Sequence, residues 1–174
     1  LGLDNTVYGL AVASFPVGAI VAGLAAAALI RRFGSAKVAV FGTILTGVGV
    51  LAAGLAPSVW LFALGLFLGG AMDAITDVGQ NAHALRVQRG YGRSILNSFH
   101  AVWSIGAVLG GTMAAGAIAL RLPLGWHLAI SGVLFSVVSL VALRFCLPGR
   151  DEAADEDAVA DAEEVSTAVR AGIR

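Results

Sequence analysis

Long uncharged segments dominate the sequence and leave few folds open to it. A helix needs about 20 mostly apolar residues to cross roughly 30 Å of hydrocarbon. Five segments meet this requirement: residues 9–30, 38–56, 59–84, 98–120 and 126–147. Because these segments are apolar on all sides, five buried helices of a soluble protein would have no polar face to cover them. The sequence therefore predicts an all-α transmembrane fold over residues 1–148.

Charge is scarce and unevenly placed. Only 13% of the 174 residues are charged, against about 25% in a typical soluble domain. Asp73 and Asp77 are the only acids between Asp4 and Asp151, and eight of the 11 acids lie at or after Asp151. Residues 149–174 hold too few large apolar side chains to build a core. We expect them to form an acidic cytoplasmic linker that contains no functional site.

Lysine and arginine indicate how the segments are oriented. Two connectors carry three positive charges each: Arg31, Arg32 and Lys37 in the first, and Arg86, Arg89 and Arg93 in the third. The second connector carries none, and the fourth carries only Arg121. Short cytoplasmic loops are rich in Lys and Arg, so the first and third connectors are expected in the cytoplasm. The N-terminus is then outside and the acidic tail inside a cell membrane, expected to be a bacterial inner membrane.

Glycine and proline indicate where the helices approach one another or bend. Small residues let membrane helices pack closely, and Gly65-x-x-x-Gly69 and Gly106-x-x-x-Gly110 have this spacing. We interpret both as packing surfaces and not as dimer contacts. Pro16 is expected to bend the first helix, because proline cannot complete the helical hydrogen-bond pattern.

Two carboxylates inside an apolar segment are the strongest indication of function. Asp73, Asp77 and Asn81 are spaced four apart, which places them on one face of a helix over residues 59–84. An ionised carboxylate deep in a bilayer costs several kcal/mol. It is retained where water, a proton or a solute reaches it. His100 is expected at comparable depth on the next, antiparallel helix. We predict that these four side chains bind a proton or a solute; the alternative is that they only hydrogen-bond neighbouring helices.

The first connector resembles a motif of a known family. Residues 27–38 are similar to the loop between helices 2 and 3 of Major Facilitator Superfamily (MFS) transporters, whose pattern is G-x-x-x-D-[RK]-x-G-[RK]-[RK]. Arg32, Gly34 and Lys37 fit this cytoplasmic loop motif. Ala27 replaces its glycine and Arg31 replaces its aspartate. The aspartate-centred contact that the family pattern implies therefore has no counterpart at position 31.

A second and more specific resemblance covers residues 77–111. This stretch is similar to the helix 4 to helix 5 region of the fucose-permease-like branch of sugar transporters. That branch carries Asp and Asn late in helix 4, a Gly-Arg loop, and F-H-x-x-[FW]-S-x-G at the start of helix 5. The residues that fit are Asp77, Asn81, Gly92, Arg93, Phe99, His100, Trp103, Ser104 and Gly106, and Gln88 stands where Glu is usual.

The resemblance implies a place for this chain in a larger carrier. It extends over residues 1 to about 150 and implies helices 2 to 6, a five-helix fragment of the N-terminal six-helix half of an MFS carrier. Residues 149–174 would form the linker between the two halves. Because the sequence begins at Leu1 and not at a methionine, we expect helix 1 and the C-terminal half to be supplied by the rest of the same protein. Alternating access would then come from rocking one half against the other.

The leading hypothesis is a secondary active transporter, a proton-coupled symporter of a small polar solute such as a sugar. Drug or metabolite efflux is the alternative within the same class. A non-transporting membrane sensor or scaffold is the alternative from another class. We expect the solute, protons and the lipid bilayer as partners, and no nucleic acid.

An enzyme is not expected. Gly69-x-x-x-Asp73-x-x-x-Asp77 matches half of the metal-binding motif of CDP-alcohol phosphotransferases, but the upstream Asp ligands of that motif are absent. A divalent metal ion would have too few oxygen ligands. Cys146 is the only cysteine and no Cys/His spacing suits a metal. The sequence therefore predicts no metal and no cofactor.

Overall fold

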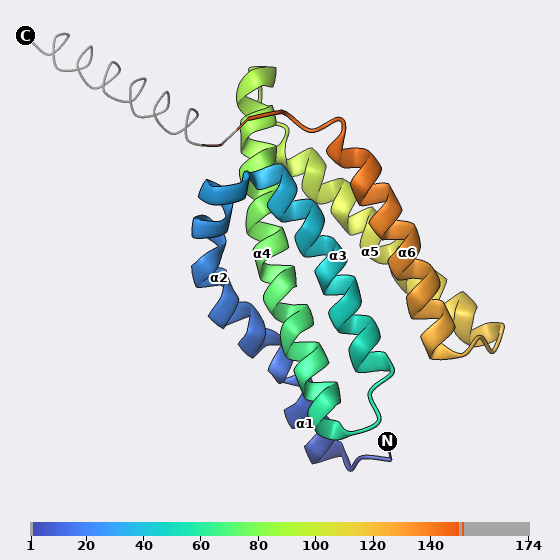
Figure 1. The fold of residues 1–174 in the computed structure, drawn as a ribbon. Coiled ribbons are helices and arrows are strands. Elements are labelled where there is room, and N and C mark those ends of the chain that lie inside the picture. Colours follow the sequence, from blue (N-terminus) through green and yellow to red (C-terminus); the bar gives the residue numbers. More distant parts are fainter. Residues whose placement is uncertain (1, 150, 152–174) are drawn as a thin grey trace, which may run out of the picture.

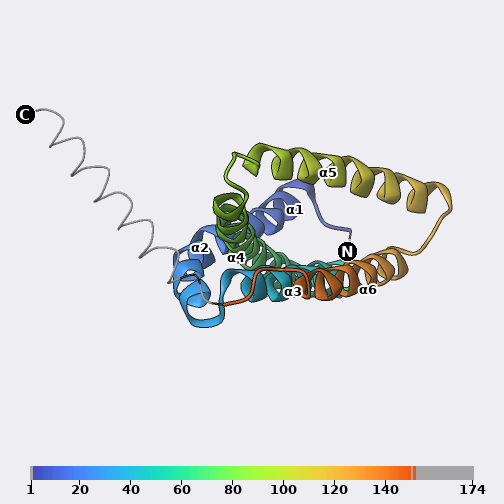
Figure 2. The same ribbon diagram turned by 90° about the horizontal axis from the view of Figure 1, so that it is seen from above.

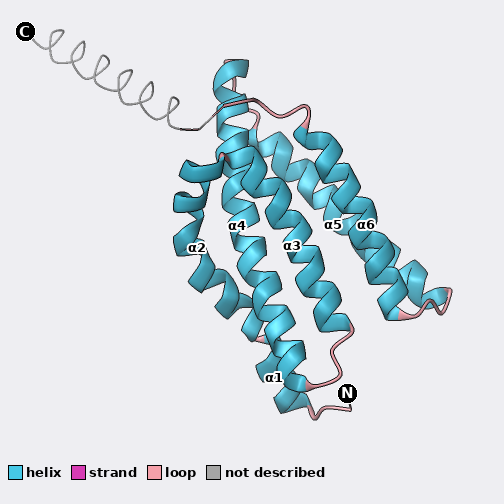
Figure 3. Ribbon diagram, in the orientation of Figure 1, coloured by secondary structure: helices cyan, strands magenta, loops and turns pink. Residues whose placement is uncertain are grey.

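The computed structural model describes residues 2–149 and residue 151, and every regular element in that part of the chain is a helix (Figure 3). The helices are α1 (Asn5–Val12), α2 (Ser14–Phe33), α3 (Ser35–Gly54), α4 (Val59–Tyr91), α5 (Leu96–Ala119) and α6 (Leu124–Leu143). α1 and α2 follow one another as one interrupted helix, so five helices are long and apolar enough to cross a membrane. They run alternately up and down the bundle (Figure 1). The predicted all-α fold is confirmed.

The helices extend further at one end of the bundle than the sequence indicated. α4 continues past residue 84 to Tyr91, so Arg86 and Arg89 lie on a helix and not in a connector. Gly34 alone separates α2 from α3. Its φ of 86° lies in a region that glycine adopts without the steric cost of a side chain. The first predicted connector, residues 31–37, is therefore almost entirely helical.

The six positive side chains of the first and third predicted connectors gather at the end of the bundle where α2 and α4 finish. They are Arg31, Arg32, Lys37, Arg86, Arg89 and Arg93. We call this the basic end. The connectors are shorter than predicted, so most of these charges lie on helices. All six still lie at the same end, because α2, α3 and α4 alternate in direction. Residues 152–174 of the expected acidic linker lie outside the described residues.

A break between α1 and α2 accompanies Pro16. Pro16 is the third residue of α2 and has no N–H to donate to the carbonyl of Val12, so the helical pattern is interrupted just before it. The hydroxyl of Ser14 lies 2.6 Å from the Ala11 carbonyl oxygen and 2.8 Å from that of Ala63 on α4. The predicted bend is thus present, and the Ser14 hydroxyl links the interrupted helix to α4.

Glycines allow α2, α3 and α4 to pack at backbone distance. Gly65 of α4 faces Ala53 of α3, whose nitrogen would lie 2.7 Å from an added Cβ. One turn along, a Cβ on Gly49 of α3 would meet the nitrogen of Gly69 at 2.7 Å. The Gly65-x-x-x-Gly69 packing surface is therefore confirmed as the contact between α3 and α4.

The second predicted packing surface, on α5, faces open space. Outside the adjacent backbone of α5 itself, no described atom lies within 4 Å of a Cβ added at Gly106 or Gly110. Within α5 only Ala117 is buried, and within α6 no residue is. Figure 2 shows α3 and α6 side by side and α5 standing apart from them. The compact part of the bundle is therefore α2, α3 and α4, with α6 against α3.

Asp4 caps the N-terminus of α1. Its carboxylate accepts hydrogen bonds from the backbone N–H groups of Thr6 at 2.7 Å and Val7 at 3.1 Å. These bonds stabilise the ionised form and hold the pKa of Asp4 below its ordinary value of 3.8. The cap is therefore complete above pH 3.8 and is lost as the pH falls through the lowered pKa.

We expect the Thr6 and Val7 amides to lose protection from hydrogen exchange on acidification below pH 3.8, after correction for the intrinsic exchange rate. Exchange measured by NMR across the acid range tests this. Asp4→Asn is the matched control, because an amide oxygen caps the helix without titrating. Equal acid sensitivity in both proteins would contradict the role of the carboxylate.

Candidate functional site

A cavity of about 740 Å³ opens among α3, α4, α5 and α6. Most of its wall is apolar, as expected for helices of this composition. Seven polar side chains also line it: Thr43, Asp77, Gln80, Asn81, His83, His100 and Ser139. Three aromatic side chains complete the wall: Phe99, Trp103 and Phe145. A few convergent polar groups in an apolar cavity are typical of small-molecule sites.

Three of the four predicted proton- or solute-binding residues meet in this cavity. Asp77 and Asn81 come from α4, and His100 comes from the first turns of α5. The side-chain amide of Asn81 donates to Asp77 Oδ1 at 3.3 Å and to the Asp77 carbonyl oxygen at 3.0 Å. The only ion pair among the described residues joins other groups. Asp77 therefore has a neutral amide as its partner and not a lysine or arginine.

Asp73 does not line the cavity with them. It is exposed on the same helix, one turn further from the basic end than Asp77. Between the two carboxylates, Ile75 and Thr76 are buried in the contact with α2 and α3. The predicted stripe does share one face of α4, but the cavity extends over only the part of that face nearest the basic end. Of the four predicted proton- or solute-binding residues, three therefore line the cavity and Asp73 lies outside it.

The residues of the cytoplasmic loop motif lie outside the cavity. Arg32 is exposed with its guanidinium 5.3 Å from the ring centroid of Phe33, and Arg93 is 5.7 Å from that of Tyr91. Lys37 is exposed on the first turn of α3. Gly34 is buried, and a Cβ added there would lie 3.5 Å from the carbonyl oxygen of Gly149. The chain that follows α6 therefore passes directly over the α2–α3 junction.

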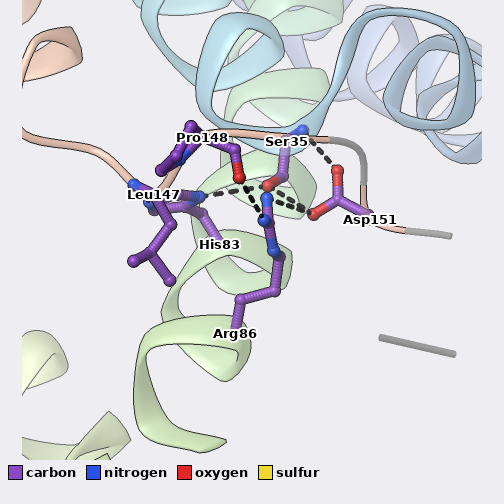
Figure 4. A network of polar contacts seen from close by, with 6 residues as sticks. All are labelled: Ser35, His83, Arg86, Leu147, Pro148 and Asp151. Carbon is purple, nitrogen blue, oxygen red and sulfur yellow. Dashed lines mark hydrogen bonds and ion pairs between the residues drawn. The ribbon is translucent and has the colours of Figure 1, made fainter. Parts of the chain in front are cut away.

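A polar network at the basic end was not predicted, and Figure 4 shows it. The Asp151 carboxylate accepts from the Ser35 backbone N–H at 2.6 Å and from the Ser35 hydroxyl at 2.7 Å. It also pairs with the Arg86 guanidinium at 3.2 Å. Asp151 belongs to the predicted linker, residues 149–174, and it anchors the start of that linker to α3 and α4. It caps the N-terminus of α3, where unpaired N–H groups attract a negative charge.

His83 belongs to the same network. Its Nδ1 lies 3.2 Å from the Ser35 hydroxyl, and its Nε2 accepts from the Leu147 N–H at 3.3 Å. Arg86 also donates to the Pro148 carbonyl oxygen at 2.9 Å. Ser35 is separated from Asp151 by 116 residues and Arg86 by 65. No local pattern in the sequence could have joined residues at these separations.

Gln88 closes the turn between α4 and α5. Its side-chain oxygen accepts from the backbone N–H groups of Ile95 at 2.9 Å and Leu96 at 3.0 Å. These groups lie at the start of α5, where backbone N–H groups have no partner within the helix. In the sequence, Gln88 is a departure from the family pattern, which has Glu at this position. Its contacts fix the start of the helix that carries His100.

Comparisons with known proteins agree with this architecture. The chain matches the Major Facilitator Superfamily over residues 1–172. It is 33% identical over 126 residues to the uncharacterized transporter y4wD of Sinorhizobium fredii, a match that covers 72% of this chain and 33% of that protein. It is 31% identical over 81 residues to an uncharacterized MFS-type transporter of Yersinia pestis, covering 47% of this chain and 20% of that protein.

A comparison with solved structures gives no significant match. The aligned regions span a third or less of the two relatives' own lengths. The five long apolar helices indicate a chain that crosses the membrane several times. On the family match and on these relatives, the chain is a multi-pass membrane protein and belongs to the Major Facilitator Superfamily.

Proposed function

We propose that this chain forms part of a proton-coupled secondary transporter of a small polar solute such as a sugar. The observation that carries the proposal is the meeting of Asp77, Asn81 and His100 in one cavity between apolar helices. A carboxylate and an imidazole can each take up and release a proton. The amide of Asn81 and the nearby Gln80 offer donors and acceptors for solute hydroxyl groups.

Proton coupling requires a carboxylate whose access to water changes during the transport cycle. Asp77 lines the cavity among α3, α4, α5 and α6, so opening and closing of that cavity would change the access of water to this carboxylate. Asp73, exposed one turn away on the same face of α4, remains a second candidate for this role. Because Asp77 lines the cavity and Asp73 does not, we assign proton coupling to Asp77 in preference to Asp73.

The rest of the protein would complete the transport path. The open glycine face of α5 and the exposed surface of α6 support the proposal that further helices pack there. We assign them to helix 1 and to a C-terminal half of the same protein. The gathering of six positive charges supports placing the basic end in the cytoplasm of a bacterial inner membrane, with the N-terminus of this chain outside.

Uptake by the full-length protein in lipid vesicles tests the proposal. Radiolabelled hexoses and pentoses would be supplied with and without an inward proton gradient. We expect the gradient to drive accumulation of at least one sugar and a proton ionophore to abolish it. Accumulation at the same rate with and without the proton gradient would contradict proton coupling. Gradient-driven extrusion of an aromatic cation with no sugar uptake would instead support the efflux alternative.

A further inference from the structure

The hydrogen bonds around His83 have a fixed direction. The Leu147 backbone N–H can only donate, so the Nε2 atom that it contacts at 3.3 Å must be an unprotonated acceptor. A neutral imidazole then carries its proton on Nδ1, which lies 3.2 Å from the Ser35 hydroxyl oxygen. That hydroxyl donates in turn to Asp151 Oδ1 at 2.7 Å. The geometry therefore assigns one tautomer to His83.

These contacts fasten the chain after α6 to α3 and α4. We call residues 147–149 and 151 the latch segment. Asp151 holds the start of α3, Arg86 holds Asp151 and the Pro148 carbonyl, and His83 holds Leu147. The Asp151 side of the network is shielded from water, because Ser35 is fully buried and the side chains of Arg86 and Asp151 are only 12% and 13% exposed, whereas the bond from Leu147 to His83 is exposed.

The groups facing His83 come from three parts of the chain. Arg86 lies on its own helix, Ser35 is contributed by α3, and Asp151 by the latch segment. His100 of α5 and Asp77 of α4 line the cavity that His83 also lines. The Nε2 atom of His83 is hydrogen-bonded to none of these side chains; it accepts from the backbone N–H of Leu147. That bond is the one contact of the latch that a proton on His83 must break.

We propose that His83 makes the latch sensitive to pH. Protonation places a hydrogen on Nε2, directly facing the Leu147 N–H, and two donors cannot form a hydrogen bond. The Leu147 end is then released, while the Asp151 end stays bound through Ser35 and Arg86. The latch is closed when His83 is neutral, opens as the pH falls through the pKa of His83, and closes again when the pH is raised. This device does not depend on the transport activity proposed above.

Hydrogen exchange at the Leu147 amide tests the proposal directly. The full-length protein would be studied by NMR in lipid nanodiscs from about pH 8 to about pH 4.5, a range that includes the ordinary histidine pKa of about 6.5. We expect the protection factor of Leu147, corrected for intrinsic exchange, to fall about fivefold on acidification, as for the loss of one hydrogen bond. An unchanged protection factor would overturn the proposal.

His83→Gln is the matched variant. A glutamine amide oxygen can accept from the Leu147 N–H at every pH, and its N–H can still reach Ser35. We expect Leu147 in this variant to remain protected throughout the pH range. The same acid-induced loss in His83→Gln and in the native protein would show that another group titrates, and the role of His83 would be rejected.

The tautomer provides a second test that needs no substitution. Nitrogen-15 shifts of the imidazole at about pH 8 are expected to show the proton on Nδ1 of His83. A proton on Nε2 would contradict the assigned bond to Leu147 and overturn the proposal. Asp151→Ala removes the acceptor of the Ser35 N–H and is expected to expose that amide to exchange, while the Leu147 N–H keeps its own acceptor on His83 and stays protected.

Discussion

Asp77→Asn is expected to reduce proton-driven uptake by the full-length protein about a hundredfold. Groups that transfer protons in enzymes contribute effects of this size or larger, and asparagine cannot carry a proton between two states. The substitution preserves the shape of the side chain and a hydrogen bond to Asn81, which lies 3.3 Å from Asp77 Oδ1. We therefore expect the cavity to remain intact. The measurement is the initial rate of uptake in vesicles with an inward proton gradient.

Exchange of solute across the membrane at equal pH serves as the control, because it requires solute binding but no net proton movement. It should stay within a few-fold of the native rate in Asp77→Asn. Asp73→Asn provides the comparison on the same helix face, and we expect a smaller loss because Asp73 lies outside the cavity. If Asp73→Asn alone abolishes driven uptake, coupling belongs to Asp73. If both variants keep proton-driven uptake, the hypothesis of proton coupling through α4 is wrong.

Gly70→Ala is expected to lower the free energy of unfolding of this chain by about 3 kcal/mol, the upper part of the range for overpacked sites. A Cβ at Gly70 would collide with the carbonyl oxygen of Phe15 on α2. A Cβ at Gly18 of α2 would collide with the carbonyl oxygen of Phe67 on α4. Since both obstacles are backbone atoms, the helices themselves must separate. Unfolding in mixed micelles, followed by circular dichroism, measures the effect.

Gly23→Ala on α2 is the matched control for this destabilisation. Outside the adjacent backbone of α2 itself, no described atom lies within 4 Å of a Cβ added at Gly23, so alanine should stabilise the helix by about 0.5–1 kcal/mol. Equal stabilities for the two variants would mean that α2 and α4 do not approach as closely as described. The pair separates a packing effect from the general preference of helices for alanine.

The spacing of residues on one helix was a reliable guide wherever the relevant contact was local. Four-residue spacing predicted that Asp77 and Asn81 share a face of α4, and they are hydrogen-bonded there. The same reasoning included Asp73, which the cavity does not reach. Periodicity fixes the direction in which a side chain points, but the length of a cavity depends on where neighbouring helices diverge.

The two glycine motifs illustrate the same limit. Gly65-x-x-x-Gly69 and Gly106-x-x-x-Gly110 are indistinguishable as patterns, since both offer a groove with no side chains. The first is filled by α3 and the second faces open space among the described residues. Whether a groove has an occupant is a property of the bundle and not of the helix that carries it.

Five long apolar helices and the basic end of the bundle could be predicted from the sequence alone, because the length and charge of each segment decide whether and in which direction it can cross a bilayer. The contacts of Asp151 with Ser35 and Arg86, and of Ser35 with His83, became visible only in the folded bundle. Such contacts join residues 65 and 116 positions apart. Their formation depends on how helices pack, which no local spacing records.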